Sequence, residues 1–407
     1  MRLAEKFHLT YSSNIHPGET WEEVERNLAT FVPAIRRRLC PEDAFGVGLR
    51  LSAQAAKGLE RAENLAAFQK FLGEQNCYVF TINGFPYGVF HWARVKEQVY
   101  LPDWKDEKRL DYTNRLARIL AVLLPAEDDL EGSVSTVPGA FKENVRSEED
   151  AQQMARLMLE HVVLLDKLRE QTGKTISLAL EPEPCCYLET VDEVLTFFHD
   201  YLFSADALHM LVETLALPLA KAESVARRHI GICYDACHMA VEFEEAVEAL
   251  QKLEDAGIKI CKFHISSALR LEFRGGDGQA QAVLAPFVES TYLHQVVEKS
   301  SKGLVRYTDL PEALAQEAKA HSQGRQGEKK EWRVHFHVPI FLSEMKNFRT
   351  TQDHLVSLID FLKSNPVCPY LEVETYTWDV LPGEYKHLDT ASAISKELNW
   401  VRNRIVS

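Results

Sequence analysis

The sequence predicts an α/β protein with parallel strands, in its simplest form a (β/α)8 barrel of the TIM type. Short apolar runs alternate with longer segments of helical period along the whole chain of 407 residues. This alternation is typical of parallel sheets, because each crossover between parallel strands is usually a helix. A barrel of eight such units takes roughly 250 residues and grows with insertions. We therefore expect a single barrel domain over residues 1–407.

Nine segments have the composition of strands, one more than a barrel of eight strands needs. Each is apolar or β-branched and is bounded by turn residues. In chain order these segments are 8–14, 44–52, 77–84, 132–138, 176–183, 230–238, 258–266, 333–341 and 370–376. Helical period between them predicts helices at 19–38, 53–73, 106–124, 146–172, 190–228, 241–256, 309–321, 350–364 and 388–405.

Two local signals bear on this architecture. Thr20 and Glu23 fit a capping box at the start of the first helix. A doubly wound open sheet is the alternative to a barrel, and it usually carries a glycine-rich phosphate loop after its first strand. No such loop follows residues 8–14, and the short 46-GVG-48 lies inside the second predicted strand. The barrel is therefore favoured.

Residues 268–332 interrupt the alternation of predicted strands and helices just before the last strand. They contain the glycine-rich turn 274–279, two strand-like runs at 291–298 and 304–310, and a polar run at 321–330. We expect this segment to be an insertion above the barrel rather than a separate domain.

Composition limits the class of protein. The formal net charge of −14 argues against nucleic acid or an anionic membrane surface as the main partner. Eight cysteines in 407 residues are too sparse for a disulfide framework and favour a reducing compartment. The N-terminus has no apolar signal region, and the apolar run 116–126 is too short to span a bilayer. We expect a cytoplasmic protein that acts on a small molecule.

Ligand-type side chains stand at four predicted strand ends, where parallel barrels carry their active sites. These residues are Glu181, Asp235, His264 and Glu374. Burying an unpaired carboxylate is costly, so a single one usually marks a salt bridge or a helix cap. Four together instead suit a divalent cation such as Mn, Mg, Co or Zn. Such a metal polarises a substrate carbonyl or hydroxyl as a Lewis acid.

Further polar residues near strand ends are expected to line the same pocket and contact a substrate. They are Asn14, His16, Arg50, Asn83, Arg333 and His335. Strand parity places Arg333, His335 and His337 on one face of 333–341, and we expect all three to face the pocket. This segment is the barrel's seventh strand, with His337 as metal ligand, or it covers a site in which His264 is the ligand. The spacing of His264 to its neighbours favours the second arrangement.

The motifs LALEPEP, YDACH, KFHISSALR and LEVETY, in that order, resemble the xylose isomerase-like TIM barrels, the sugar phosphate isomerase/epimerase superfamily. The resemblance implies one divalent metal with four ligands: Glu181, Asp235, His264 and Glu374. In members that are ketose 3-epimerases, an Arg follows the seventh-strand His by six residues, as Arg270 follows His264 here. By this resemblance Glu181 and Glu374 form the acid/base pair, and His238 and Arg270 contact the substrate.

Longer runs distributed over nearly the whole chain are similar to the EboE family of bacterial metabolite traffic proteins. These runs are 9-LTYSSNIHPGETW-21, 80-FTINGFPYG-88, 98-QVYLPDW-104, 335-HFHVPIF-341 and 371-LEVETYTWDVLP-382. That family is encoded beside a UbiA-like prenyltransferase, so the resemblance implies a functional link to such an enzyme and a role in a secondary-metabolite pathway.

Three functions are consistent with these residues. The favoured one is a metal-dependent isomerase or epimerase of a small hydroxy or carbonyl metabolite. A non-catalytic barrel that binds or carries a prenylated or precursor compound is the first alternative. Aromatic residues near strand ends favour it, namely Phe85, Tyr87, Trp104, Tyr376 and Trp378. A metal-dependent phosphoesterase is the second alternative, and it needs a further metal held by His238, His335 and His337.

Overall fold

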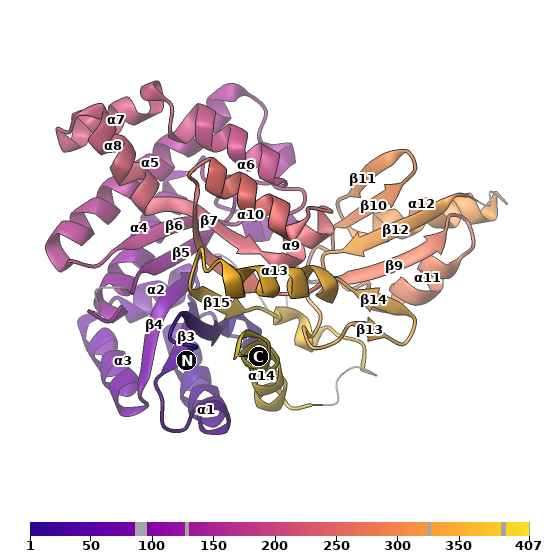
Figure 1. The fold of residues 1–407 in the computed structure, drawn as a ribbon, viewed down its shortest axis with the longest axis horizontal. Coiled ribbons are helices and arrows are strands. Elements are labelled where there is room, and N and C mark those ends of the chain that lie inside the picture. Colours follow the sequence, from indigo (N-terminus) through magenta and orange to yellow (C-terminus); the bar gives the residue numbers. More distant parts are fainter. Residues whose placement is uncertain (86–95, 127–129, 324–326, 384–387, 407) are drawn as a thin grey trace.

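The computed structural model describes residues 1–85, 96–126, 130–323, 327–383 and 388–406. Eight parallel strands form a barrel, which confirms the predicted fold class (Figure 1). Around the ring they are β2 (Phe7–Tyr11), β15 (Tyr370–Val373), β8 (Lys259–Ile265), β7 (Ile230–Asp235), β6 (Ile176–Leu180), β5 (Gly132–Thr136), β4 (Cys77–Asn83) and β3 (Phe45–Arg50). A parallel bridge between Ser12 and Gly48 joins β2 to β3 and closes the ring. The short β1 (Arg2–Leu3) pairs antiparallel with β2.

Helices follow the strands, and most of them surround the barrel, whereas two helices between β8 and β15 lie to one side of it (Figure 1). They are α1 (Trp21–Leu39), α2 (Ala53–Leu59), α3 (Ala62–Glu74), α4 (Glu107–Leu123), α5 (Glu148–Thr172), α6 (Val191–Phe197), α7 (Ala205–Leu215), α8 (Leu219–His229), α9 (Ala236–Val241), α10 (Ala246–Asp255), α11 (Gln279–Leu284), α12 (Leu310–Ser322), α13 (Gln352–Ser364) and α14 (Thr390–Val406). Short 3-10 or π turns are η1 (Ser13–Ile15), η2 (Lys96–Tyr100), η3 (Lys142–Asn144), η4 (Phe198–Leu202), η5 (Ala285–Phe287) and η6 (Tyr376–Asp379). Within the described ranges no helix is both long and apolar enough to cross a lipid bilayer.

Two predicted helices are interrupted. The segment 53–73 is divided into α2 and α3, and 190–228 contains α6, η4, α7 and α8. The second division has local causes. The Ser204 side chain accepts a hydrogen bond from the Ala207 amide and starts α7, and Pro218 starts α8 because proline cannot continue a preceding helix.

A second, antiparallel sheet lies between β8 and β15 in the sequence and beside the barrel in space (Figure 1). Its strand order is β11 (Gly303–Tyr307), β10 (Val296–Ser300), β12 (Lys329–Val334), β9 (Leu269–Arg274), β14 (Phe348–Thr350) and β13 (Glu344–Met345). This sheet is the insertion before the last barrel strand, and it continues past residue 332 to Thr350.

The ninth predicted strand belongs to this insertion. Only its first residues, Arg333 and Val334, are in a strand, and they pair with β9 and β10 rather than with the barrel. The prediction of one strand over 333–341 is therefore wrong after Val334. A tight turn ends the strand, because the Phe336 amide donates to the Val334 carbonyl. The seventh barrel strand is β8, which carries His264.

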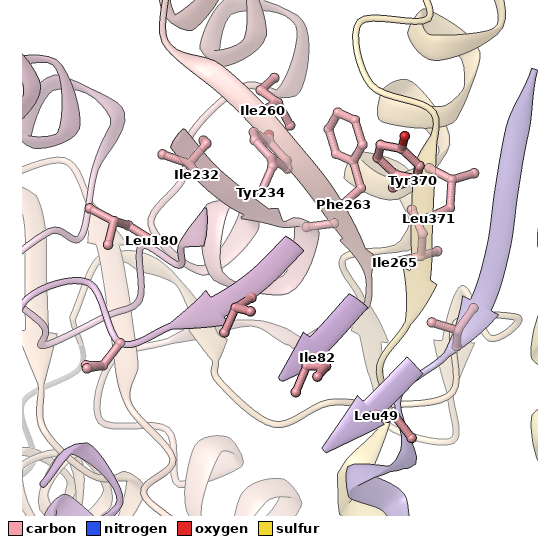
Figure 2. Close-up of a cluster of buried hydrophobic side chains, with 14 of the residues drawn as sticks. Leu49, Ile82, Leu180, Ile232, Tyr234, Ile260, Phe263, Ile265, Tyr370 and Leu371 are labelled. Atoms are coloured by element: carbon pink, nitrogen blue, oxygen red, sulfur yellow. The ribbon is translucent and has the colours of Figure 1, made fainter. Parts of the chain in front are cut away.

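Much of the hydrophobic core lies outside the ring of strands, and the interior of the ring holds charged as well as apolar side chains. Figure 2 shows apolar side chains projecting from the barrel strands, among them Phe263 and Ile265 of β8. The alternate residues of β8, Lys262 and His264, point to the opposite side by strand parity. Barrel interiors usually hold branched apolar residues, so charged groups here call for an explanation.

Candidate active site

His264 brings the four predicted metal ligands together at the carboxyl ends of β6, β7, β8 and β15. Its Nδ1 atom lies 2.8 Å from Glu181 Oε1, 3.2 Å from Glu374 Oε2 and 3.4 Å from Asp235 Oδ2. All four side chains are buried. One imidazole nitrogen carries at most one proton, so it can satisfy only one of these three carboxylates.

The residues present fit a divalent cation. The ligand atoms of the four side chains all lie within 4.8 Å of one another. Glu181 Oε2 and Asp235 Oδ2 are buried and accept no hydrogen bond from the residues that the structure describes. Three carboxylates and one imidazole form a donor set typical of Mn, Zn, Co or Mg sites. A cation in their midst would neutralise carboxylate charge that the described side chains leave uncompensated.

The second nitrogen of His264 has its own carboxylate partner. His264 Nε2 lies 3.1 Å from Glu372 Oε2, and Lys262 Nζ donates to the same oxygen over 2.6 Å. The sequence shows Glu372 beside Glu374 in LEVETY, but nothing in strand parity distinguishes a ligand from its supporting group. Glu372 was therefore not among the predicted site residues.

Two asparagines hold Glu374. Asn14 Nδ2 donates to Glu374 Oε1 over 2.8 Å, and Asn83 Nδ2 lies 3.4 Å from the same oxygen. The other oxygen, Oε2, is the one directed at His264. Both asparagines were predicted to contact a substrate, and the structure places them behind a predicted ligand, with Asn14 also lining the cavity.

Three histidines form a second cluster beside the first. Each Nδ1–H donates to a carbonyl oxygen: His238 to Pro182 (3.0 Å), His335 to the Gln295 side chain (2.8 Å) and His337 to Glu374 (2.8 Å). Carbonyl oxygens only accept hydrogen bonds, so each neutral ring has its lone pair on Nε2. The Nε2 atoms face one another, at 3.0 Å between His238 and His335 and at 3.3 Å between His335 and His337.

A cavity opens above these groups. Its lining includes the polar residues Glu181, Glu374, His238 and His335. It also includes four aromatic residues: Phe85, Tyr100, Tyr292 and Tyr376. The arrangement of a few polar groups against an aromatic wall is typical of a small-molecule site.

Glu183 also lines this cavity and was not among the predicted site residues. Burial raises the pKa of Glu183 to about 7, although a hydrogen bond of 2.5 Å from the Tyr100 hydroxyl opposes the shift. The sequence shows this residue only as the second glutamate of EPEP. Its environment depends on Tyr100 and Gln295, which are distant in the chain and left no local signal.

The expected orientation of Arg333 toward the pocket is wrong. Its guanidinium donates to the Ala240 carbonyl over 2.6 Å and lies 4.0 Å from the centre of the Phe243 ring. The turn after Val334 separates Arg333 from His335, so strand parity does not extend across the segment. Arg270 lies opposite Arg333 in the second sheet, and neither arginine lines the cavity.

Arg50 and His16 lie in a different hollow from the cavity. Arg50 Nη1 donates to the Gly18 carbonyl over 2.9 Å, and His16 lies 3.1 Å from the Tyr11 hydroxyl. Neither residue is among those that line the cavity, contrary to expectation.

Only some of the aromatic residues expected near the strand ends line the cavity. Phe85 and Tyr376 line the cavity, whereas Trp104 is fully buried and donates to Thr136. Trp378 is also buried and is absent from the cavity wall. Tyr87 lies outside the described residues.

Comparison with known proteins gives likenesses of fold. No family model and no curated protein sequence matches the chain. A probable 3-DHS dehydratase, AsbF from Bacillus anthracis, aligns at 12% identity over 96% of this chain and 97% of that one, with a TM-score of 0.45. The IOLI protein with a bound zinc atom aligns at 12% identity over 98% of both chains, with a TM-score of 0.49.

A D-tagatose 3-epimerase-like protein aligns at 13% identity over 98% of both chains, with a TM-score of 0.46. The activities named for these proteins belong to them, and the roles assigned below rest on the side chains of this chain. The resemblance to the EboE family stays a prediction.

Proposed function

We propose that the protein is a divalent-metal-dependent isomerase or epimerase that moves a proton at a carbon beside a carbonyl group. The observation that carries this proposal is the convergence of Glu181, Glu374 and Asp235 on one nitrogen of His264. Epimerisation at such a carbon uses a base on one face and an acid on the other. Glu181 and Glu374 reach the cavity from strands that are separated by β7 and β8.

A bound divalent cation would supply Lewis-acid polarisation of the substrate carbonyl. Glu181 and Glu374 would take up and return the proton, each with one oxygen directed toward the cation site. Asn14 keeps Glu374 in place through its Oε1 atom. His238 lines the cavity with its Nε2 beside His335 Nε2, and a substrate hydroxyl could contact it there.

Deuterium exchange tests this chemistry with simple carbonyl compounds in place of the natural substrate. Small unphosphorylated ketoses and hydroxy ketones would be incubated in D2O with the metal-loaded protein and followed by proton NMR. We expect loss of the signal of one carbon-bound proton next to the carbonyl, and no loss with Glu181→Gln. Exchange that is equal in wild type and Glu181→Gln would overturn the proposal.

The histidine cluster supports a second candidate, metal-assisted phosphoester hydrolysis. Three neutral imidazoles whose lone pairs face one another repel unless a proton or a cation lies between them. A second cation there would stand next to the first, as hydrolysis with two metals requires. The distinguishing result is a stoichiometry of two cations per chain, reduced to one by His335→Ala, with cleavage of a phosphodiester such as bis-p-nitrophenyl phosphate.

The aromatic wall of the cavity supports the remaining candidate, a barrel that binds or carries a prenylated or precursor compound. However, the partners described for Glu181, Asp235 and Glu374 are imidazoles, amides and hydroxyls rather than the arginines that a metal-free carrier would need. We therefore favour catalysis. From the EboE-like runs we further propose a substrate from a secondary-metabolite pathway, and a cytoplasmic role beside a UbiA-like prenyltransferase.

A further inference from the structure

A buried ion pair lies beneath the candidate metal site, inside the ring of strands. Lys262 Nζ and Glu372 Oε2 are 2.6 Å apart, and both side chains are completely buried. Glu372 Oε2 also accepts a hydrogen bond from His264 Nε2, while Glu372 Oε1 has no hydrogen-bond partner in the described part of the chain. The carboxylate is thus directed at the one nitrogen of His264 that does not face the predicted ligands.

Stability alone does not account for this pair. Removing two charges from water costs more than their attraction usually returns, and apolar replacements of buried pairs are often neutral or stabilising. Most barrels fill this region with branched apolar residues. A charged pair at this position therefore points to a role that an apolar pair would not perform.

The neighbouring strand leaves space for the Glu372 side chain. A Cβ atom added to Gly48 of β3 would lie 2.1 Å from Glu372 Oε1 and 2.7 Å from the Tyr11 carbonyl oxygen. Both distances are far inside van der Waals contact, and the second involves backbone that cannot move aside. Glycine at position 48 is thus required by the position of Glu372 and by the close approach of β2.

Lys262 also supports Glu374, a second predicted metal ligand, through Asn83. Its Nζ donates to Asn83 Oδ1 over 2.7 Å, which fixes the orientation of the Asn83 amide. The amide nitrogen is thereby turned toward Ser12 Oγ, at 2.6 Å, and toward Glu374 Oε1, at 3.4 Å. One ammonium group thus supports both the imidazole and one carboxylate of the site.

We propose that Lys262 and Glu372 are positioning residues that prepare His264 and Glu374 for a divalent cation. Glu372 accepts a hydrogen bond from His264 Nε2 and so keeps the proton on that nitrogen. The lone pair of Nδ1 then points to the centre of the three carboxylates, where the cation would bind. Lys262 balances the charge of Glu372 and orients Asn83. Carboxylates that support metal-bound histidines typically raise metal affinity by roughly 10- to 100-fold. The inference rests on the metal site of the proposed function.

The test compares metal affinity in wild type and in Glu372→Gln. The dissociation constant for Co²⁺ is measured by competition with a chelator, and the visible spectrum of bound Co²⁺ reports the ligand geometry. We expect Glu372→Gln to weaken binding by roughly 10- to 100-fold and to change the spectrum. The matched control is Glu317→Gln, which removes a buried carboxylate that pairs with Lys330 in the second sheet, outside the barrel. It should leave both readouts unchanged.

The double variant Lys262→Met/Glu372→Gln covers the case in which the single variant fails to fold. It removes both buried charges together and is expected to fold, while its Co²⁺ affinity stays as low as that of Glu372→Gln. Wild-type affinity and spectrum in both Glu372→Gln and the double variant would overturn the positioning role. A wild-type protein that binds no Co²⁺ at all would instead overturn the proposed function and this inference with it.

Discussion

His238 and His335 lie with their Nε2 atoms 3.0 Å apart although 97 positions separate them in the chain. His238 is in α9, directly after barrel strand β7, and His335 follows β12 of the second sheet. The contact shows that the insertion reaches into the barrel opening and supplies part of the cavity wall. The candidate site is thus built from both sheets.

Replacing His335 should distinguish the role of the carboxylate cluster around His264 from that of the three histidines. His335 contributes no atom to the group of Glu181, Asp235, His264 and Glu374. We expect His335→Ala to bind its tightest divalent cation with an affinity close to that of wild type, because the His335 side chain hydrogen-bonds to none of these four. Because the side chain lines the cavity, the KM of any substrate should rise. Calorimetric titration checks the affinity, and a loss as large as that of Glu181→Gln would contradict the assignment.

Replacing Arg270 should lower the stability of the protein rather than change the chemistry of the candidate active site. Its guanidinium lies 3.0 Å from Glu331 and 2.9 Å from Asp353, and it is not part of the cavity wall. Arg270→Met removes the cation beside Asp353 and leaves Glu331 paired with Arg333 alone, so we expect a loss of up to about 1 kcal/mol in the free energy of unfolding. Urea denaturation measures the loss. Unchanged stability with a large fall in kcat/KM would instead support the substrate contact that the family resemblance implies.

Glu397 should make the stability depend on pH. Burial raises the pKa of Glu397 from 4.5 to about 7, against the opposing hydrogen bonds from Thr375 and the Ile340 amide. Because the folded protein binds this proton more tightly than the unfolded chain, the associated stability is fully present below about pH 4.5. It is lost as the pH rises through about 7, and the difference amounts to about 3 kcal/mol.

Glu397→Gln keeps an acceptor for Thr375 and the Ile340 amide but removes the titration. We therefore expect the variant to lose less stability than wild type between pH 5 and pH 8. Thermal unfolding of the metal-free protein at both values measures the effect. Parallel pH profiles for the two proteins would show that Glu397 is not the group responsible.

Two glycines should respond in opposite directions to alanine. At Gly48 the new methyl group meets Glu372 Oε1 and the Tyr11 carbonyl oxygen, so we expect a loss of about 3 kcal/mol from overpacking. At Gly73, in α3, the methyl group meets nothing within 4 Å, and alanine should add up to about 1 kcal/mol. Chemical denaturation compares the two variants, and a Gly48→Ala protein as stable as wild type would contradict the described packing.

The features that the sequence predicted correctly depend on short-range patterns. The apolar runs identified the barrel strands, and ligand-type residues at strand ends marked His264 and the three carboxylates that lie around it. Both signals lie within a few residues of each strand. The barrel then brings the strand-end residues together, because the carboxyl ends of parallel strands meet at one end of it. The strand over 333–341 was misassigned because the tight turn after Val334 has no proline or glycine to mark it.

The missed residues depend on contacts between distant parts of the chain. Glu372 supports His264 only because β15 lies beside β8 in the barrel. Glu183 has its raised pKa because it is buried, beside Tyr100 of η2 and Gln295 just before β10. Neither environment is encoded within a few residues of the glutamate itself, so pattern alone could not separate these carboxylates from ordinary strand-end residues.

The most direct test of the metal site is thermal unfolding of wild type and Glu181→Gln with and without a divalent cation. A cation that binds only the folded protein stabilises it by about 2.7 kcal/mol at 100 times its dissociation constant. We predict that Mn²⁺, Co²⁺ or Zn²⁺ raises the Tm of chelator-treated wild type and that Glu181→Gln shows little or no rise. A wild-type Tm that does not change with any of these cations would contradict the metal site.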